Sequence, residues 1–320
     1  MKEQKEYKKE KKNKKIKVKK NIYQITSKVC IILSIFLILG WVGLYALNYK
    51  VDYYSAVLTP TEDEVEIVKK SEISALVCGI NGYLTDTIIY VRANLETGKI
   101  AYMSIPRDTY VNNPYCIGHK INAIYRKIDI NPLISQVEKM LDVNIDYYLL
   151  VDNEIVKNAV DTIGGVEFNV PIDMKYDDGS QNLHIDLKAG LQILDGNKAE
   201  QVIRFRKNNN GTGYRLGDID RVKVQQDFIK AFIKQAAKPE NILNADKIIK
   251  TVLLDADTNV TVREAISYVT DVPKMNLDNI YTTTAIGTTP YINNISYFKM
   301  NEKETRKIIQ EKFFDELDKK

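Results

Sequence analysis

Beyond residue 72, the pattern of hydrophobic and polar positions predicts short strands interleaved with helices. Short apolar or β-branched runs bounded by turn residues predict strands, and they cover residues 73–80, 87–93, 99–105, 145–151, 166–170 and 279–284. Apolar side chains spaced three and four residues apart predict helices, at 153–163, 220–237, 245–254 and 302–317. Because helices alternate with strands, the sequence predicts an α/β fold in which helices cover a central sheet.

Two turns interrupt this pattern. Residues 94–98 (NLETG) separate two of the strands and predict a hairpin. Gly164 and Gly165 follow the helix at 153–163, where a glycine C-cap is expected.

A longer apolar run lies near the N-terminus. Residues 29–49 (VCIILSIFLILGWVGLYALNY) contain no charged residue, and at ~1.5 Å per residue they can cross a hydrocarbon core of ~30 Å. Trp41, Tyr45 and Tyr49 lie toward the far end of the run, where aromatic side chains favour the headgroup region. The sequence therefore predicts one transmembrane helix at 29–49.

Positive charge is concentrated before this run. Residues 1–28 hold twelve Lys and three Glu, whereas the formal net charge of the whole chain is only +4. A lysine run can be a nucleic-acid arm, but the apolar run that follows favours a membrane anchor and no nucleic-acid partner. The positive-inside rule then predicts a cytoplasmic tail at 1–28 and translocation of everything after Lys50.

The anchor divides the remaining chain. A cleaved signal peptide is the alternative, but the apolar run exceeds the usual h-region and no A-x-A-like site follows. Residues 50–71 are interpreted as a stalk, because Thr59-Pro60 interrupts any continuous helix. Residues 72–320 are predicted to form one extracytoplasmic catalytic domain of a single-pass protein of the cell membrane.

Two segments hold more charge than a solvated surface needs. The first comprises Asp86 and the segment 104–109 (SIPRDT), in which a proline ends a strand just before Arg107 and Asp108. The second comprises Arg204 and Arg206, a Gly/Asn-rich loop at 208–213, and the segment 217–221 (GDIDR) that opens the long helix.

The second segment has the properties of an anion site. At ~100° per residue, Asp218, Arg221 and Gln225 fall within roughly 60° of one another on the helix. Arginine presents a fork of donors suited to phosphate oxygens, and a helix N-terminus adds aligned N–H groups. The sequence predicts a phosphate site here; ordinary surface ion pairs, such as Arg204 with Glu200, are the alternative.

Seven motifs stand in a fixed order along the chain. They are Asp86-Thr87, 104–109 (SIPRDT), 120–125 (KINAIY), 146–148 (DYY), 161–166 (DTIGGV), 204–206 (RFR) and 217–226 (GDIDRVKVQQ). From about Ile73 to Lys234, this series strongly resembles the LytR-CpsA-Psr family.

The resemblance implies a three-layer α/β/α domain around a mixed central sheet, with a polyprenyl tail held in an apolar groove. It also implies a phosphotransferase of cell-wall assembly. Such an enzyme moves a glycopolymer, for example teichoic acid or capsule, from a polyprenyl-pyrophosphate carrier to peptidoglycan. The acceptor is typically a muramic-acid hydroxyl, and the products are a phosphodiester and polyprenyl phosphate.

The resemblance also implies roles for single residues. The catalytic set is Asp86, Arg107 and Asp218. Asp86 is the expected magnesium ligand and a candidate base, so Mg²⁺ is the implied cofactor. The residues that match pyrophosphate contacts of the family are Arg107, Arg204, Arg206 and Arg221, with Lys120 and Gln225 in support.

This chain departs from the family pattern at Asn81, where a second acidic metal ligand is expected. The loop at 208–213 is longer than usual and is expected to be mobile, as a tolerated insertion or a lid. His119 borders the Lys120 motif and is interpreted as a surface histidine. Cys78 lies in an apolar run and is expected to be a buried thiol; its pairing with Cys116 stays open.

Two other functions use the same residues. A non-catalytic membrane regulator or precursor sensor would keep the fold without turnover, and Asn81 favours it. A pyrophosphatase acting on the lipid carrier would use water as the acceptor. Retention of the four arginines with Asp86 and Asp218 favours an enzyme.

Overall fold

The computed structural model describes residues 69–126, 129–180, 183–215 and 217–319. The predicted tail at 1–28, the predicted transmembrane helix at 29–49 and nearly all of the predicted stalk lie outside these residues. Within them, no helix combines the length and apolar character that a membrane crossing requires.

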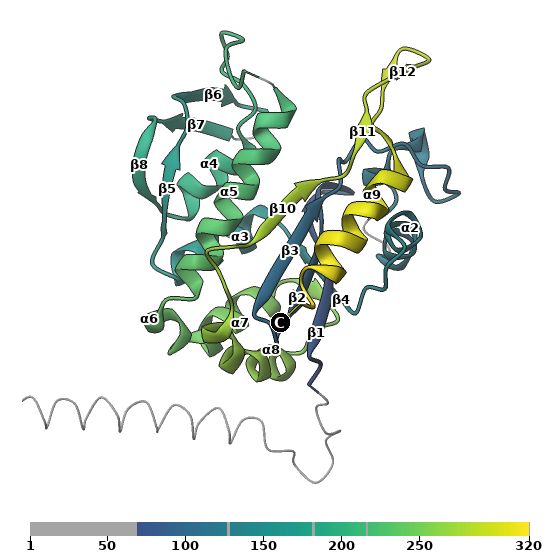
Figure 1. The fold of residues 1–320 in the computed structure, drawn as a ribbon. Coiled ribbons are helices and arrows are strands. Elements are labelled where there is room, and N and C mark those ends of the chain that lie inside the picture. The colour runs from purple at the N-terminus through teal and green to yellow at the C-terminus, as the bar shows by residue number, and fades with distance from the viewer. Residues whose placement is uncertain (1–68, 127–128, 181–182, 216, 320) are drawn as a thin grey trace, which may run out of the picture. The chain divides into compact units, whose positions relative to one another are not determined.

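A mixed six-stranded sheet forms the centre of the domain, in the order β10-β3-β2-β1-β4-β9 (Figure 1). Its strands are β1 (Glu72–Asn81), β2 (Leu84–Asn94), β3 (Lys99–Ser104), β4 (Tyr147–Val151), β9 (Asp257–Thr258) and β10 (Tyr281–Thr284). The pairs β1–β4 and β3–β10 are parallel and the others antiparallel. The predicted α/β class is therefore confirmed.

The predicted hairpin at 94–98 joins β2 to β3 and sets their register. The side chain of Asn94 accepts hydrogen bonds from the backbone N–H groups of Glu96 and Thr97, each at 3.0 Å. Gly98 has a φ of +70°, and a Cβ there would lie 2.3 Å from the Lys274 carbonyl. This turn pairs Asn94 with Lys99 and, further along, Ile89 with Ser104.

The two faces of the sheet have unequal cores. On one face, twenty-two buried hydrophobic residues of the described chain pack between the strands, α2 (Asn131–Leu141) and the helical segment 309–315. On the other face, the buried core consists of Ile89, Tyr102 and Ile280, with half-buried side chains of α5 (Asp218–Ala236) against them. In Figure 1, α5 and α9 (Glu302–Ile308) lie on opposite sides of the strands.

A second core lies next to the sheet. It packs α3 (Asn153–Thr162), α4 (Gly196–Arg204) and α5 against two small antiparallel sheets. One sheet pairs β5 (Val166–Val170) with β8 (Gly190–Leu194), and the other is the hairpin of β6 (Met174–Asp178) and β7 (Leu183–Leu187), which lies between β5 and β8 in the chain. The remaining elements are α6 (Pro239–Ile242), α7 (Ala245–Leu253), α8 (Val262–Tyr268), β11 (Gly287–Thr288), β12 (Tyr291–Ile292), β13 (Ile295–Ser296) and β14 (Lys299–Met300).

Contacts with α3 position the start of α4. Gly164 and Gly165 have φ values of +79° and +87° and end α3, as predicted. The carboxylate of Asp161 accepts a hydrogen bond of 2.7 Å from the backbone N–H of Gly196, the first residue of α4. A Cβ at Gly196 would lie 2.5 Å from the Lys157 carbonyl. Glycine thus lets the two helices approach closely.

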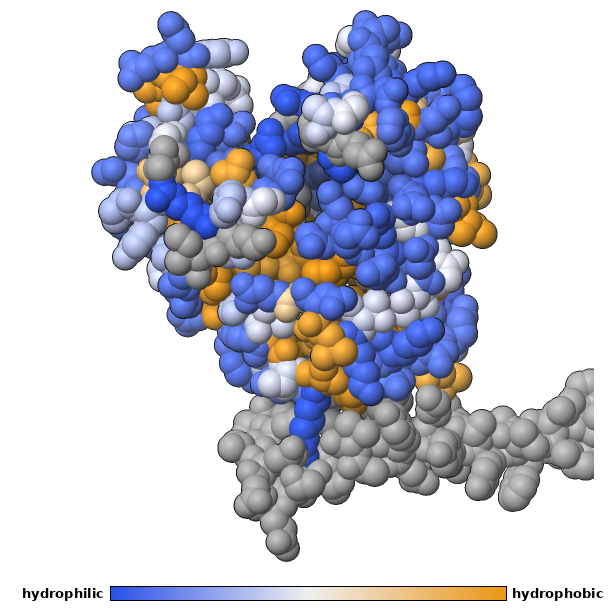
Figure 2. Space-filling view, turned by 180° about the vertical axis from the view of Figure 1, so that it is seen from behind, coloured by the Kyte–Doolittle hydropathy of each residue, from blue (hydrophilic) through white to orange (hydrophobic). Residues whose placement is uncertain are grey.

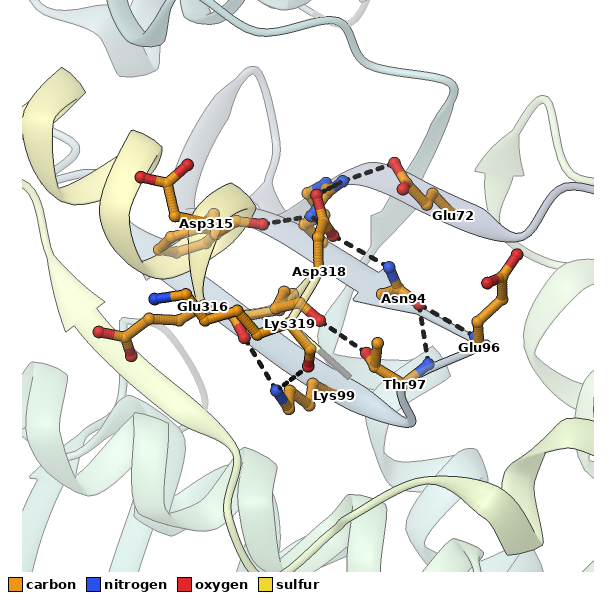
Figure 3. A network of polar contacts seen from close by, with 12 residues as sticks. Glu72, Asn94, Glu96, Thr97, Lys99, Asp315, Glu316, Asp318 and Lys319 are labelled. Atoms are coloured by element: carbon orange, nitrogen blue, oxygen red, sulfur yellow. Dashed lines mark hydrogen bonds and ion pairs between the residues drawn. The ribbon is translucent and has the colours of Figure 1, made fainter.

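The C-terminal segment is tied to the β2–β3 hairpin (Figure 3). Arg92, on β2, is 3% exposed and pairs with both Glu72 and Asp318. The Thr97 hydroxyl donates to the Leu317 carbonyl at 2.7 Å. The predicted helical segment at 302–317 is helical from Glu302 to Asp315, with one difference: α9 ends at Ile308 and residues 309–315 continue it as a π-helix.

We expect the domain to lose stability when the pH falls below about 4. Burial alone would raise the pKa values of Asp146, Asp271 and Asp318, but lysine, arginine, serine and asparagine donors hold all three below the usual value. A lowered folded-state pKa stabilises the fold above the unfolded-state value near 3.8 and loses that contribution as the pH falls through the folded-state value. Urea denaturation should give a nearly constant midpoint from pH 7 to about 5 and a falling one below about 4.

A comparison with Asp146→Asn isolates one contribution. The variant should be less stable at pH 7 and should lose less stability on acidification than the wild type. An identical acid dependence in the two proteins would contradict the assignment to Asp146.

Candidate functional site

Asp86 and Arg107 meet at the end of the central sheet. Asp86 lies near the start of β2, and Arg107 follows β3 by three residues. If the register that pairs Ile89 with Ser104 continues by three residues on each strand, Asp86 falls opposite Arg107. Arg107 Nη1 lies 2.6 Å from Asp86 Oδ1, and both side chains are about one-third exposed. The pair is therefore accessible to a ligand.

Asn81 lies beside Asp86. Its Nδ2 is 3.4 Å from Asp86 Oδ2, across the β1–β2 turn in which Gly82 has a φ of +61°. A half-turn of the amide would present its carbonyl oxygen to the same place. The structure therefore brings the two predicted metal ligands together, one as a carboxylate and one as a neutral amide.

The side chain of Lys120 pairs with a carboxylate rather than pointing to open solvent. Its Nζ lies 3.0 Å from Asp108 Oδ1 and 5.6 Å from the ring centroid of Tyr297. Asn122 N donates to the Arg107 carbonyl at 3.2 Å. The segments 104–109 and 120–125 thus lie against each other. This placement agrees with the expectation that Arg107 and Lys120 contact the same pyrophosphate.

Three of the predicted phosphate-binding arginines lie on or next to α4 and α5. Arg204 is the last residue of α4 and pairs with Glu200 at 2.8 Å, which is the ion pair named above as the alternative. Arg206 is exposed, and Phe205 between them is fully buried with its ring edge-on to Tyr214 at 5.3 Å.

Tyr214 places Arg221 in the same region. The Tyr214 carbonyl accepts a hydrogen bond of 3.1 Å from Gly217 N, and the Gly217 carbonyl accepts one of 3.2 Å from Arg221 N, so Tyr214 lies next to the first turn of α5. Because Phe205 contacts the ring of the same tyrosine, the end of α4 and the start of α5 converge. The structure therefore brings the 204–206 motif close to Arg221.

Two glutamines fix α5 in this position. Gln225 was predicted to support phosphate binding, but its Nε2 donates to the Ile203 carbonyl at 3.0 Å and so holds α5 against α4. Gln226, which ends the 217–226 motif and was given no role from the sequence, is 8% exposed. Its Nε2 donates to Ser104 Oγ at 3.0 Å and to the Thr283 carbonyl at 2.9 Å. It therefore links α5 to the strand that leads into Arg107.

The remaining predicted residues have simpler placements. Asp218 is the first residue of α5, and its side chain lies outside the described residues. The loop at 208–213 is hydrogen-bonded to β6: Asn208 Oδ1 accepts from Lys175 N at 2.6 Å and Asn209 Oδ1 from Asp177 N at 2.7 Å. These bonds attach the loop to β6, and its mobility stays a prediction.

The sheet face toward α5 keeps apolar side chains partly accessible. Val77 and Leu149 are neighbours in the β1–β4 register and both are half-buried, as is Val151. Figure 2 shows apolar surface recessed between two flanking regions of hydrophilic surface. Two hollows, of about 480 and 620 Å³, lie elsewhere, along α7 and between the end of α2 and α9. Neither borders the predicted arginines.

Both cysteines among the described residues are free thiols. Cys78 is fully buried, as predicted, and burial raises the pKa of its thiol far above the usual value. Cys116 is also free, and its thiol donates to the Lys120 carbonyl at 2.8 Å. The pairing of Cys78 with Cys116 does not occur in the structure.

The residues available for a metal are few. No group of three or more His, Cys, Asp or Glu side chains suited to a metal ion occurs in the part of the chain that the structure describes. Asp86 and the neighbouring Asn81 amide fit a hard cation that takes oxygen ligands and keeps several waters. The protein alone thus supplies part of a Mg²⁺ shell.

The fold and these residues define an α/β domain with a candidate site for a phosphorylated ligand, in which a carboxylate–guanidinium pair ends the sheet near a group of arginines. The chain matches the LytR_cpsA_psr family over residues 48–313. It therefore belongs to that family, as the sequence motifs suggested.

Named relatives and solved structures agree with this placement. The chain is 29% identical to the polyisoprenyl-teichoic acid--peptidoglycan teichoic acid transferase TagV of Bacillus subtilis (strain 168), over 78% of this chain and 66% of TagV. It is 30% identical to TagU of the same strain, over 78% of this chain and 80% of TagU. The crystal structure of B. subtilis TagV superposes with a TM-score of 0.65 at 27% identity, covering 77% of this chain and 98% of that one.

Proposed function

We propose that this protein transfers a glycopolymer from a polyprenyl-pyrophosphate carrier to peptidoglycan. The observation that carries the proposal is the accessible Asp86–Arg107 pair, linked through Ser104 and Gln226 to the helix that bears Arg221. The names of TagV and TagU support a teichoic acid as the glycopolymer class and peptidoglycan as the acceptor.

The chemistry follows from the charges. A hydroxyl oxygen of the acceptor attacks the sugar-bearing phosphorus, and the bridging P–O bond to the lipid-bearing phosphate breaks. The acceptor proton passes to the carboxylate of Asp86, and polyprenyl phosphate leaves with the bond's electron pair. Fixed cations lower the barrier because negative charge grows on the leaving oxygen. Arg107, Arg204, Arg206 and Arg221 supply these cations.

The lipid requires an apolar surface near the site. The half-buried side chains Val77, Leu149 and Val151 leave the α5 side of the sheet incompletely covered. Figure 2 shows that the molecule has recessed apolar surface. We assign the polyprenyl tail to this side. A three-layer α/β/α arrangement with α5 as part of one outer layer suits this assignment.

Asp86, Asn81 and the pyrophosphate would together hold Mg²⁺. When bound, the ion would neutralise charge on the non-bridging phosphate oxygens.

The test is an assay of the full-length protein in detergent with a labelled polyprenyl-pyrophosphate glycopolymer. With soluble peptidoglycan fragments present, label should appear on the glycan and polyprenyl phosphate should be released. Release at the same rate without fragments, with no labelled glycan, would indicate a pyrophosphatase instead. Binding without release in both arms would indicate a sensor, so each result selects one of the three functions.

We expect protease added outside intact cells to remove the domain after Lys50. The lysine-rich residues 1–28 and the uncharged run 29–49 favour a membrane anchor with the N-terminus in the cytoplasm. An antibody against the tail should then detect a short protected fragment. A domain that resists external protease but is digested in opened cells would reverse the orientation.

Asn81→Asp should strengthen Mg²⁺ binding in the absence of substrate. A second carboxylate beside Asp86 adds a charged oxygen ligand to a shell that otherwise depends on substrate phosphates. Titration calorimetry, with and without a pyrophosphate analogue, should show a larger gain for the free protein than for the complex. Equal affinities of wild type and variant under both conditions would remove Asn81 from the metal shell. Asn112→Asp, at an exposed position, is the control.

A further inference from the structure

An exposed aromatic pair lies three residues beyond Arg107. The rings of Tyr110 and His119 stack with centroids 5.4 Å apart and planes 20° apart. Tyr110 is 39% exposed, and His119 is exposed as well. The transfer chemistry proposed above gives these two rings no role.

Neighbouring groups hold the pair in place. Tyr297, 5% exposed, packs edge-on against Tyr110 at 5.3 Å, and its hydroxyl donates to the Gly118 carbonyl at 3.2 Å. Gly118 and His119 both have left-handed φ values, +77° and +56°. For a histidine this conformation costs roughly 1 kcal/mol or more and persists only where surrounding contacts enforce it. The turn therefore sets His119 over Tyr110 at a cost in backbone strain.

The surface beside the pair suits a neutral ligand with many hydroxyl groups. Lys120 and Asp108 pair at 3.0 Å, so their charges offset each other while both still offer hydrogen-bonding atoms. The face of an aromatic ring carries negative charge density and attracts the weakly positive C–H groups of a pyranose. Rings next to a donor and an acceptor therefore match a sugar better than a phosphate.

The pair lies on the acceptor side of the site. Val111 and Ile121, which flank it in sequence, belong to the core shared with α2, whereas Phe205 and Val224 belong to the core of α4 and α5. In a phosphoryl transfer the attacking and leaving oxygens are roughly in line. With the lipid-bearing leaving group toward the arginines of α4 and α5, the attacking hydroxyl arrives from the side of Tyr110.

We infer that the Tyr110–His119 pair is a subsite for an N-acetylhexosamine ring of the acceptor glycan. The inference rests on the proposed transferase function. It names the surface that positions the acceptor sugar so that its hydroxyl reaches the phosphorus near Asp86.

The test measures KM for the acceptor and for the donor separately in the full-length protein. His119→Asn removes the ring and keeps a residue that tolerates the left-handed backbone; Tyr110→Leu removes the other ring. Each should raise the acceptor KM about tenfold, as loss of one ring contact predicts, and leave the donor KM unchanged. Tyr110→Phe should behave like the wild type. His184→Asn, at an exposed histidine on β7, is the matched control.

Other outcomes overturn the inference in distinguishable ways. An unchanged acceptor KM in His119→Asn and Tyr110→Leu rejects the subsite. A raised donor KM with an unchanged acceptor KM assigns the rings to the sugar of the glycopolymer and rejects the acceptor assignment. If the wild type transfers nothing to glycan, the proposed function fails, and titration of wild type and His119→Asn with an N-acetylglucosamine hexasaccharide decides the subsite: weaker binding by the variant supports it, and equal or absent binding rejects it.

Discussion

Asp86→Asn is expected to lower the transfer rate constant by about a hundredfold or more. The substitution keeps the shape of the side chain and removes its charge and its capacity to accept the acceptor proton. Arg107 then loses the carboxylate that lies 2.6 Å from its Nη1, so its guanidinium becomes more available to the pyrophosphate. We therefore expect kcat to fall while the KM for the donor stays level or decreases.

The measurement is steady-state transfer of labelled glycopolymer by the full-length protein. Asp278→Asn is the control, because Asp278 is highly exposed and pairs at 2.7 Å with Lys234, on the opposite half of α5 from Arg221. That variant should retain wild-type kcat. An Asp86→Asn protein with more than half of the wild-type rate would remove Asp86 from the catalytic set.

Arg92→Met is expected to lower the free energy of unfolding by about 3 kcal/mol. The guanidinium is almost fully buried on β2, donates to the Phe313 carbonyl and lies 4.2 Å from the ring centroid of Phe314. Methionine keeps much of the apolar stem but leaves that carbonyl and Asp318 without this donor. Because the carboxylates of Glu72 and Asp318 are 49% and 41% exposed, water can solvate them, and the loss stays at the low end for a broken buried pair.

Urea denaturation measures this loss as a lower midpoint at an unchanged slope. Lys234→Met breaks an exposed pair on α5 and should change the free energy by less than about 0.5 kcal/mol. A loss below about 1 kcal/mol in Arg92→Met would mean that water replaces the guanidinium at little cost. The network in Figure 3 would then contribute little to the fold.

The hairpin part of the site could be predicted from the sequence because it is local. The turn at 94–98 fixes the register of β2 and β3 as far as Ile89 opposite Ser104, and Asp86 and Arg107 each lie three residues further along. The strand β1 and the helices α3 and α5 likewise follow from apolar periodicity over a continuous segment. Local sequence patterns are enough to predict how two segments pair when a tight turn joins them.

The rest of the site depends on contacts that no local pattern encodes. Gln225 and Lys120 match phosphate contacts by motif, yet the structure shows Gln225 bonded to the Ile203 carbonyl and Lys120 to Asp108. The strands β6, β7 and β8 were not predicted, because each has only five residues, too few for periodicity to separate it from a loop. The equally short β5 was predicted, because Gly165 and Pro171 bound it in the sequence. Their placement comes from packing against α3, α4 and α5.

Arg92 also has a consequence for protein engineering. Because Glu72 and Asp318 both pair with its guanidinium, the first strand and the last turn of the domain end side by side. A linker of a few residues could join them, and new termini could open at Asn293 and Asn294, which form the tight turn between β12 and β13. Such a circular permutant would keep the central sheet intact, with Asp86 and Arg107 on it, and would present both termini on a short exposed hairpin.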